Sequence, residues 1–112
     1  GDPQGLSNAR PDRTEPVTEN LLPGDPLSLT SGSSTVTVTE PAHKRSTNDT
    51  VVFRNVDGSP GGLVFSLFEN SSGFSITVID TNSYSFNCGS NATVTENSGG
   101  MFVTAGPVTL TP

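Results

Sequence analysis

Valine and threonine alternate strictly in the stretch TVTVT at residues 35–39, and this pattern restricts the possible fold more than any other feature of the chain. Val36 and Val38 point to one face of an extended segment and the threonines to the other, which predicts a half-buried β-strand. Similar short runs rich in β-branched and aromatic residues recur as far as residue 104, separated by turns of Gly, Pro, Asn and Asp. Because no stretch has a helical period of apolar residues, we expect an all-β fold, either a small antiparallel barrel or a sandwich.

Turn residues set the limits of the expected strands. Residues 74–78 and 84–88 flank a turn at 80–83, which predicts a β-hairpin. Residues 63–68 fit either a short strand or a single helical turn. The other expected strands are 34–39, 50–56, 92–96, 101–104 and 108–110. Since the strand-like pattern continues almost to the last residue, we expect the chain to be a segment of a longer protein.

Residues 1–30 differ from the rest of the chain because they are rich in proline. Each proline removes an amide donor and disfavours helical geometry in the residue before it, so we expect an extended arm over 1–30 and a single β-domain over 31–112. Two interpretations of the arm stay open. It is a disordered linker, or it becomes ordered against a neighbouring subunit whose grooves its leucines fill. The candidate partner contacts are Leu21, Leu22, Leu27, Leu29, Arg10 and Arg13.

Length, charge and cysteine content argue against several classes of protein. A chain of 112 residues is one small domain. Its net charge of −6, with five basic residues that form no broad stripe, argues against a nucleic-acid partner. No apolar run approaches the about 18 residues that span a bilayer, so we expect no membrane partner. The single cysteine, Cys88, excludes an intrachain disulfide.

Residue types suited to catalysis or metal binding are scarce. His43 is the only histidine and lies beside Lys44 and Arg45 in an expected loop, so we expect it to be a solvated side chain or a contact to a partner. One histidine and one cysteine are fewer than the three or four protein ligands that zinc takes, and no DxDxDG calcium loop is present. We therefore expect no catalytic residue, no cofactor and no metal.

The aromatic residues allow two expectations. Cys88 falls in phase with Tyr84 and Phe86, so we expect all three in the core, with the thiol inert. A carbohydrate site is also possible in principle, because Tyr84 and six phenylalanines supply aromatic platforms. The absence of tryptophan argues against it.

Several motifs in a fixed order resemble a known module. They are TVTVT at 35–39, PAH at 41–43, NDTVVF at 48–53, GG at 61–62, FSITV at 74–78 and DTNSYSF at 80–86. Over about residues 33–104 the chain is similar to a β-module of tailed-bacteriophage virion proteins, often described as FCCH-like after the first catalytic cysteine half-domain of ubiquitin-activating enzymes. The chain departs from that family in two places: Lys44 and Arg45 stand where a glycine commonly follows the histidine, and Asn48 replaces the usual glycine before the aspartate. We expect Asn48 to take the positive φ of that glycine, because asparagine tolerates this region better than most residues.

The resemblance implies a structural role in a phage particle. It implies a non-enzymatic, tail-associated virion component, which binds other virion proteins and forms a homo-oligomer in a symmetric assembly. Two alternatives stay open: a capsid decoration (cement) protein, and a receptor- or carbohydrate-binding module of a tail fibre. The family label carries no catalytic role to Cys88, because no ATP-binding or ubiquitin-transfer motif accompanies it.

Overall fold

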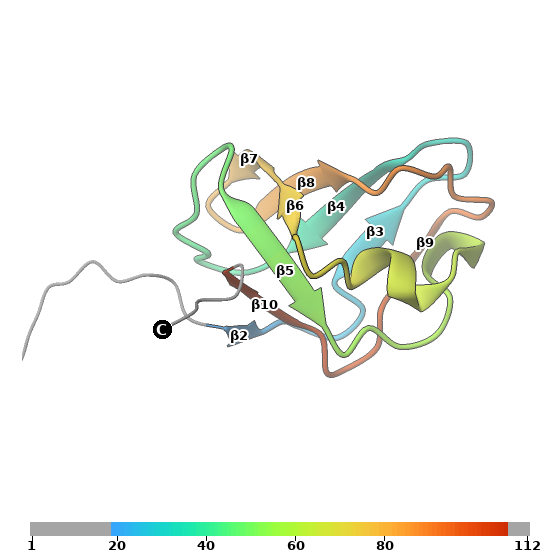
Figure 1. Ribbon diagram of the computed structural model, residues 1–112, viewed down its shortest axis with the longest axis horizontal. Helices are drawn as coiled ribbons and strands as arrows, with labels where there is room; N and C mark the ends of the chain where they lie inside the picture. The colour runs from blue at the N-terminus through green and yellow to red at the C-terminus, as the bar shows by residue number, and fades with distance from the viewer. Residues whose placement is uncertain (1–18, 108–112) are drawn as a thin grey trace, which may run out of the picture.

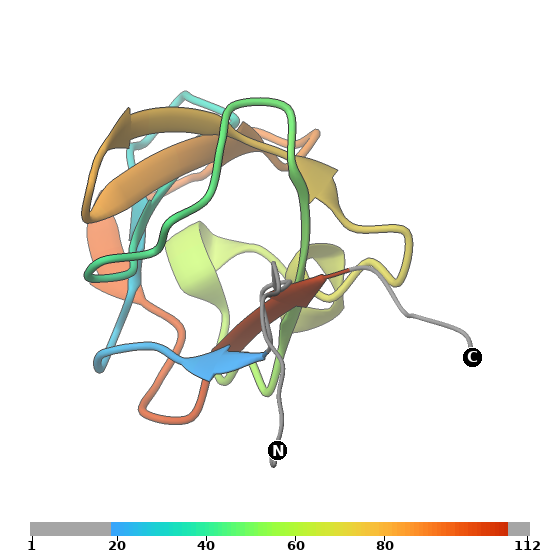
Figure 2. The same ribbon diagram turned by 90° about the vertical axis from the view of Figure 1, so that its left-hand side faces the viewer.

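The computed structural model describes residues 19–107, which form two antiparallel sheets around a shared interior (Figures 1 and 2). The larger sheet has the strand order β7-β8-β4-β3-β9 and the smaller one β2-β10-β5-β6. The strands are β2 (Asn20–Leu21), β3 (Leu27–Leu29), β4 (Thr35–Thr39), β5 (Thr50–Arg54), β6 (Phe74–Ser75), β7 (Thr77–Asp80), β8 (Ser83–Asn87), β9 (Glu96–Ser98) and β10 (Thr104–Pro107). The expected all-β antiparallel fold is confirmed.

The larger sheet follows the alternation that the sequence predicts. In β4, Val36 and Val38 are fully buried, and they lie opposite Phe86 and Tyr84 of β8. One face of this sheet is therefore apolar and the other polar, as in a sheet that packs on a core from one side.

The expected hairpin is confirmed for β7 and β8, whose register shifts between Val78 and Asp80, as in a β-bulge. The expected first strand at 74–78 is divided, because Phe74 and Ser75 form β6, which pairs with β5 in the smaller sheet.

The smaller sheet closes the other side of the core. Its central pair is β10 with β5, in register from Thr104↔Arg54 to Pro107↔Val51. Strand β2 lies on the outer side of β10, where Ala105 is paired with Asn20. The two ends of the described chain therefore lie side by side at one edge of the domain (Figure 1).

Aromatic rings fill the space between the two sheets. Phe86 stacks on Phe74 with ring centroids 4.3 Å apart and on Phe53 at 5.2 Å. Such offset aromatic pairs add to the stabilisation from buried area. Tyr84, Phe86 and Cys88 are all buried, so the expectation that they share the core face is confirmed.

The expected boundary between arm and domain is wrong. Strand β3 lies inside the larger sheet, between β4 and β9, and β2 belongs to the smaller sheet. Leu22, Leu27 and Leu29 are buried in the chain's own core, so they are not free to fill a neighbour's grooves. Leu21 is exposed. Whether residues 1–18 form an arm, and where Arg10 and Arg13 lie, falls outside the described residues.

Other elements differ from the expected ranges by a few residues. Phe65–Phe68 is a 3-10 turn, which settles the choice for this segment in favour of the helical turn. Strand β9 begins at Glu96, later than expected, because Ala92 makes only an isolated bridge to Ser31. The last strand is shifted from 101–104 to Thr104–Pro107, and the expected strand 108–110 lies outside residues 19–107. Within those residues, no helix is long and apolar enough to cross a bilayer.

Candidate functional site

Residues 42–49 form a loop that runs along the outer edge of β7 and takes the place of a further strand. The Ile76 amide donates to the Asp49 carbonyl at 3.0 Å, and the Ile76 carbonyl accepts from the Asn48 amide at 2.8 Å. The Val78 amide donates to the Thr47 hydroxyl at 2.9 Å. An uncovered edge strand is a template for aggregation. The loop thus covers the edge of the larger sheet.

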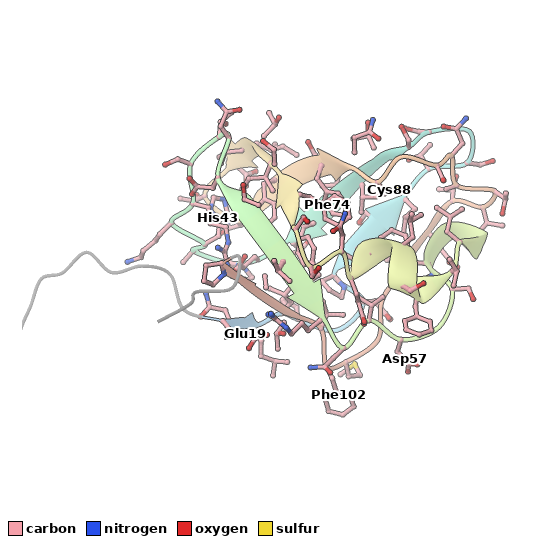
Figure 3. All side chains as sticks on the ribbon, in the orientation of Figure 1. Glu19, His43, Asp57, Phe74, Cys88 and Phe102 are labelled. Carbon is pink, nitrogen blue, oxygen red and sulfur yellow. The ribbon has the colours of Figure 1, made fainter. Side chains whose placement is uncertain are left out.

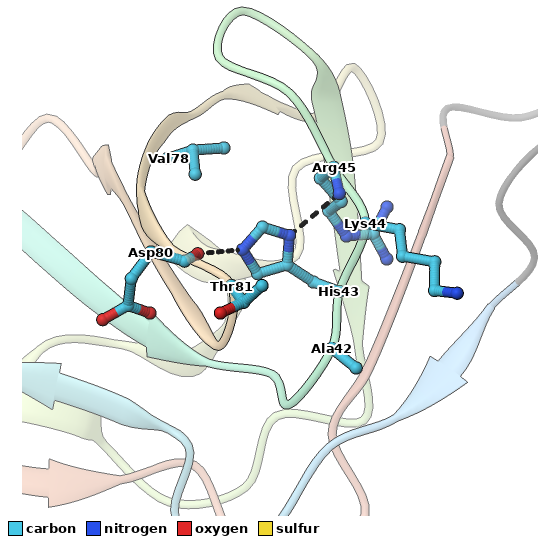
Figure 4. Close-up of a pocket in the computed structure, with 7 residues that line it drawn as sticks. All are labelled: Ala42, His43, Lys44, Arg45, Val78, Asp80 and Thr81. Atoms are coloured by element: carbon cyan, nitrogen blue, oxygen red, sulfur yellow. Dashed lines mark hydrogen bonds between the residues drawn. The ribbon is translucent and has the colours of Figure 1, made fainter.

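His43 closes this arrangement at the end of β7, and Figure 4 shows both hydrogen bonds of its ring. The Arg45 amide donates to Nδ1 at 2.8 Å, so this nitrogen is the acceptor, and Nε2 therefore carries the proton that it donates to the Asp80 carbonyl at 2.7 Å. The side chain is buried, with 4% exposed, and the expectation of a solvated loop residue is wrong. Because both nitrogens have partners, neither is available to take a proton from a substrate.

A buried charged cluster lies behind His43. The Arg45 guanidinium donates twice to the Glu40 carboxylate, at 2.9 and 3.2 Å, and the Tyr84 hydroxyl donates to the same carboxylate at 2.6 Å. Arg45 also donates to the Ala105 carbonyl at 3.2 Å, and Asn20 donates to Glu40 at 3.0 Å. Glu40 and Tyr84 belong to the larger sheet side, whereas Asn20 and Ala105 belong to β2 and β10. The cluster therefore connects the two sheets by hydrogen bonds.

The surroundings of this cluster shift the ionisation of its members. Burial, and after it the hydrogen bond to Glu40, raise the pKa of Tyr84 far above its usual range. For Arg45, burial alone would lower the pKa, but the hydrogen bonds and negative charge of Glu40 outweigh it and raise the pKa. The tyrosine is therefore neutral and the arginine is charged. Because the buried arginine donates two hydrogen bonds to one carboxylate, its role in the pair with Glu40 is structural.

Two residues of the same loop have left-handed backbone geometry. Lys44 has φ 58° and Asn48 has φ 81°. Asn48 stands where the phage module commonly has glycine. The expectation that Asn48 takes a positive φ is confirmed. The Cβ atom of lysine makes this backbone geometry strained, as it is for most residues other than glycine.

A pocket of about 280 Å³ lies between the loop and β7 (Figure 4). It is lined by residues 42–45 and by Val78, Asp80 and Thr81. The carboxylate of Asp80 and the ammonium group of Lys44 point away from the His43 ring on opposite sides. Hydrogen bonds from the Asn82 amide and then from the Ser83 hydroxyl lower the pKa of Asp80, which is exposed. The interior of the pocket is thus chiefly apolar, with charges at its rim.

A second surface feature is an apolar patch at the edge of the smaller sheet. Leu21, Met101 and Phe102 have 66%, 64% and 69% of their surface exposed. Leu22 and Val103 are hydrogen-bonded neighbours that point into the core, so Leu21 and Phe102 point outward on the same side. Large apolar side chains that are exposed near one another mark contact surfaces.

The structure shows which of the candidate contact residues from the sequence are exposed and which are buried. Of the four leucines, only Leu21 is on the surface. Tyr84 is fully buried and cannot serve as a platform for a sugar ring. Sequence reasoning missed the Glu40–Arg45 pair and the Phe102 patch. The only signal for Phe102 was an aromatic residue next to the Gly99-Gly100 turn.

Residues 19–107 contain no group of three or more His, Cys, Asp or Glu side chains that could hold a metal ion. Cys88 is buried, and its thiol lies 3.2 Å from the Ser90 carbonyl, to which it donates. Neither feature adds a reactive centre to this part of the chain.

Comparison with known proteins gives one informative result. No family model matches the chain, and no curated protein matches it, so the FCCH-like assignment stays a resemblance. Among solved structures, the endosialidase of phage phi92 is similar, with 20% identity and a TM-score of 0.64 over 82% of this chain. The fold is shared with a phage protein. The chain covers 13% of that endosialidase, and at this identity the similarity shows the fold alone.

Proposed function

We propose that this chain is a non-enzymatic structural domain of a phage virion, tail-associated, that binds neighbouring virion subunits. The observation that carries the proposal is the fold itself, which also occurs as a domain-sized part of a phage protein. The order of motifs over residues 33–104 supports the same assignment through its resemblance to a module of tailed-phage structural proteins.

The chemistry of the loop supports a structural role over catalysis. A general base needs a ring nitrogen that faces a substrate, and His43 uses both nitrogens to hold the loop against β7. Glu40 accepts four hydrogen bonds from three side chains, so its carboxylate is engaged in joining the sheets. The polar residues that most resemble active-site groups are thus committed to the fold.

Quantitative mass spectrometry of purified particles tests this proposal. Particles of the phage that encodes this chain are separated into heads and tails, and the tryptic peptide 46–54, which follows Arg45 and ends at Arg54, reports on the chain. We expect it in the tail fraction at a constant copy number per particle. Its absence from particles contradicts a virion role, and its presence in heads alone favours the capsid decoration alternative.

The tail-fibre alternative predicts binding to carbohydrate. The similar phage protein is named as an endosialidase, but this chain matches only a small part of it, so the name does not say which part meets the sugar. Since Tyr84 is buried, Phe102 is the better aromatic candidate, with 69% of its surface exposed. Glycan-array binding that is lost in Phe102→Ser supports this alternative, and turnover of a glycan by the isolated chain contradicts the non-enzymatic role.

A further inference from the structure

We propose that Phe102 of one copy inserts into the pocket beside His43 of a second copy, so that copies of the chain associate head to tail. The inference rests on the proposed structural role and deepens it, because it names the surfaces through which the domain binds its neighbour. It is carried by the exposure of Phe102, the size of the pocket and the charges around each.

Phe102 has the form of an inserting side chain. Of the large apolar residues at 19–107 it is the most exposed, and Met101 beside it is nearly as exposed. Both follow a turn that is held from two sides, since the Gly100 amide donates to the Asp25 carboxylate at 3.0 Å and the Asp57 amide donates to the Gly99 carbonyl at 2.8 Å. An aromatic side chain on a fixed turn loses little conformational entropy when it is buried by a partner.

The pocket suits one side chain. Its volume of about 280 Å³ lies just below the range of about 300–1,000 Å³ that is usual for sites of drug-sized ligands. His43 lies at the base of the pocket and Val78 at its side (Figure 4). His43 lies almost fully buried behind this lining and is held by two hydrogen bonds, so the pocket is preformed. The more exposed Ala42, Val78 and Thr81 supply the surface that an inserted ring can contact.

The charges near Phe102 are opposite in sign to the charge on the Lys44 side of the pocket. Exposed carboxylates of Asp25 and Asp57 lie next to the turn that carries Phe102. Lys44 is exposed at the rim of the pocket, and the Asp80 carboxylate points to the opposite side (Figure 4). Docking that brings the acidic turn to the Lys44 side is favoured, and the reverse orientation is disfavoured. Two copies that met patch to patch would instead bring four like charges together.

The positions of the two features decide the symmetry. His43 and Phe102 lie on well-separated parts of the molecule (Figure 3), so the contact is heterologous. After one contact, the pocket of one copy and the Phe102 of the other copy are still unused. Such contacts close into rings or continue as filaments. In a ring, each weak contact is strengthened because its neighbours hold the copies at high effective concentration.

Sedimentation velocity on the complete chain, from about 10 μM to about 1 mM, tests the contact. We expect the average mass of the wild type to rise with concentration. Phe102→Ser should weaken association by about tenfold or more, as expected for a central aromatic contact. Phe65→Ser is the matched control, because Phe65 is also exposed but lies in the 3-10 turn at 65–68, and it should associate like the wild type.

Blocking the pocket provides the complementary half of the experiment. Val78→Arg fills it with a charged chain, and Thr81→Trp, in the exposed hairpin turn, is a second blocking variant in case the first disturbs β7. Each should be monomeric alone. Mixed with Phe102→Ser, a blocked variant should give a one-to-one dimer and nothing larger. The blocked variant supplies Phe102, the Phe102→Ser variant supplies the open pocket, and no second pair of binding surfaces is left.

Three results overturn the proposal: a wild type that stays monomeric at about 1 mM, a Phe102→Ser variant that associates like the wild type, or a mixture that forms no dimer. These outcomes leave the tail-fraction experiment untouched. Conversely, absence of peptide 46–54 from particles defeats the virion role while self-association remains measurable, so the two failures are distinguishable.

Discussion

Glu40 and Arg45 place opposite charges where the side chains have only 4% and 2% of their surface exposed. Removing two ions from water costs several kcal/mol each, and their attraction offsets this cost only when the remaining hydrogen-bonding groups also find partners. Here Tyr84, Asn20 and the Ala105 carbonyl supply those partners. The pair therefore fixes how the two sheets meet, because a shifted arrangement would leave a charge unpaired.

Tyr84 gives a direct optical test of this cluster, since the chain has one tyrosine and no tryptophan. Its pKa is raised in the folded state, so the stability it contributes is complete below the unfolded value of about 10 and is lost as pH rises above it. We expect tyrosinate absorbance to appear above about pH 10 in one step, together with the loss of the β-sheet circular dichroism signal. Tyrosinate formation near pH 10 without unfolding would contradict the buried hydrogen bond, and the chain in urea, titrating near its usual value, is the control.

Lys44 occupies a backbone geometry that glycine adopts without strain, with φ 58°. Replacing it by glycine removes a strain of about 1–2 kcal/mol but increases the entropy of the unfolded chain. We expect Lys44→Gly to raise the free energy of unfolding by up to about 1 kcal/mol in urea titrations at low protein concentration. Asn48→Gly is the matched comparison and should gain less, because asparagine tolerates positive φ. A destabilised Lys44→Gly variant would show that the lysine side chain makes contacts that outweigh the strain.

At the scale of elements, the loop at 42–49 protects the edge of β7 by presenting side chains and bent backbone in place of a strand. The hydroxyl of Thr47 and the ring of His43 occupy hydrogen-bonding positions that the backbone of another chain would need. Natural sheets protect edges with such devices because an uncovered edge invites pairing with other chains. The loop therefore prevents the backbone of another chain from pairing with β7 at this edge, while the pocket beside it stays open to a side chain.

Thr47→Val tests this edge cover with little change in shape. The valine has no acceptor for the Val78 amide, so we expect a loss of about 0.5–1.5 kcal/mol in the free energy of unfolding. Hydrogen exchange of the Val78 amide should accelerate by about tenfold. Ile76, which directly precedes β7, is the internal control, because its amide donates to the Asp49 backbone carbonyl and keeps its acceptor. Equal acceleration at both positions would mean that the loop opens as one unit.

The elements that could be predicted from the sequence are those whose signals are local. Strand β4 and the hairpin of β7 and β8 follow from period-two alternation and a turn cluster. Strand β3 was missed because its three residues follow Pro26 in a proline-rich stretch, although Leu27 and Leu29 do alternate around Ser28. A three-residue pattern is too short to outweigh the prolines without knowledge of its neighbours in the sheet.

The candidate site was harder to predict because its contacts join distant parts of the chain. His43 is buried by its hydrogen bond to Asp80, and Arg45 by its bond to Ala105, which is 60 residues away in sequence. The run AHKR reads as a solvated loop by composition, since nothing local marks Glu40 as the partner. The two sides of the pocket, 42–45 and 78–81, likewise meet only through the pairing of strands.

At the scale of the whole molecule, the first described residues are structural parts of the domain. Strand β3 lies between β4 and β9, so it supplies hydrogen bonds on both sides, and Leu27 and Leu29 are almost fully buried. Residues 20–29 are thus as necessary to the core as the later strands. Any function of residues 1–18 is separate from this role, and the two are separable by experiment.

Two truncations separate these roles. Deletion of residues 1–30 removes β2 and β3, together with the buried Leu22, Leu27 and Leu29, each of which is worth about 1.5–3 kcal/mol on burial. Because that loss is comparable to the whole stability of a small domain, we expect the shortened chain to be unfolded by circular dichroism. Deletion of residues 1–18 spares both strands and should leave a cooperative thermal transition. A folded chain after the longer deletion would contradict the position of β3 inside the sheet.

The shorter deletion also tests association between copies. If the chain without residues 1–18 keeps its fold and still self-associates, the contact at Phe102 suffices without those residues. If it keeps its fold but no longer associates, those residues take a direct part in binding the neighbour.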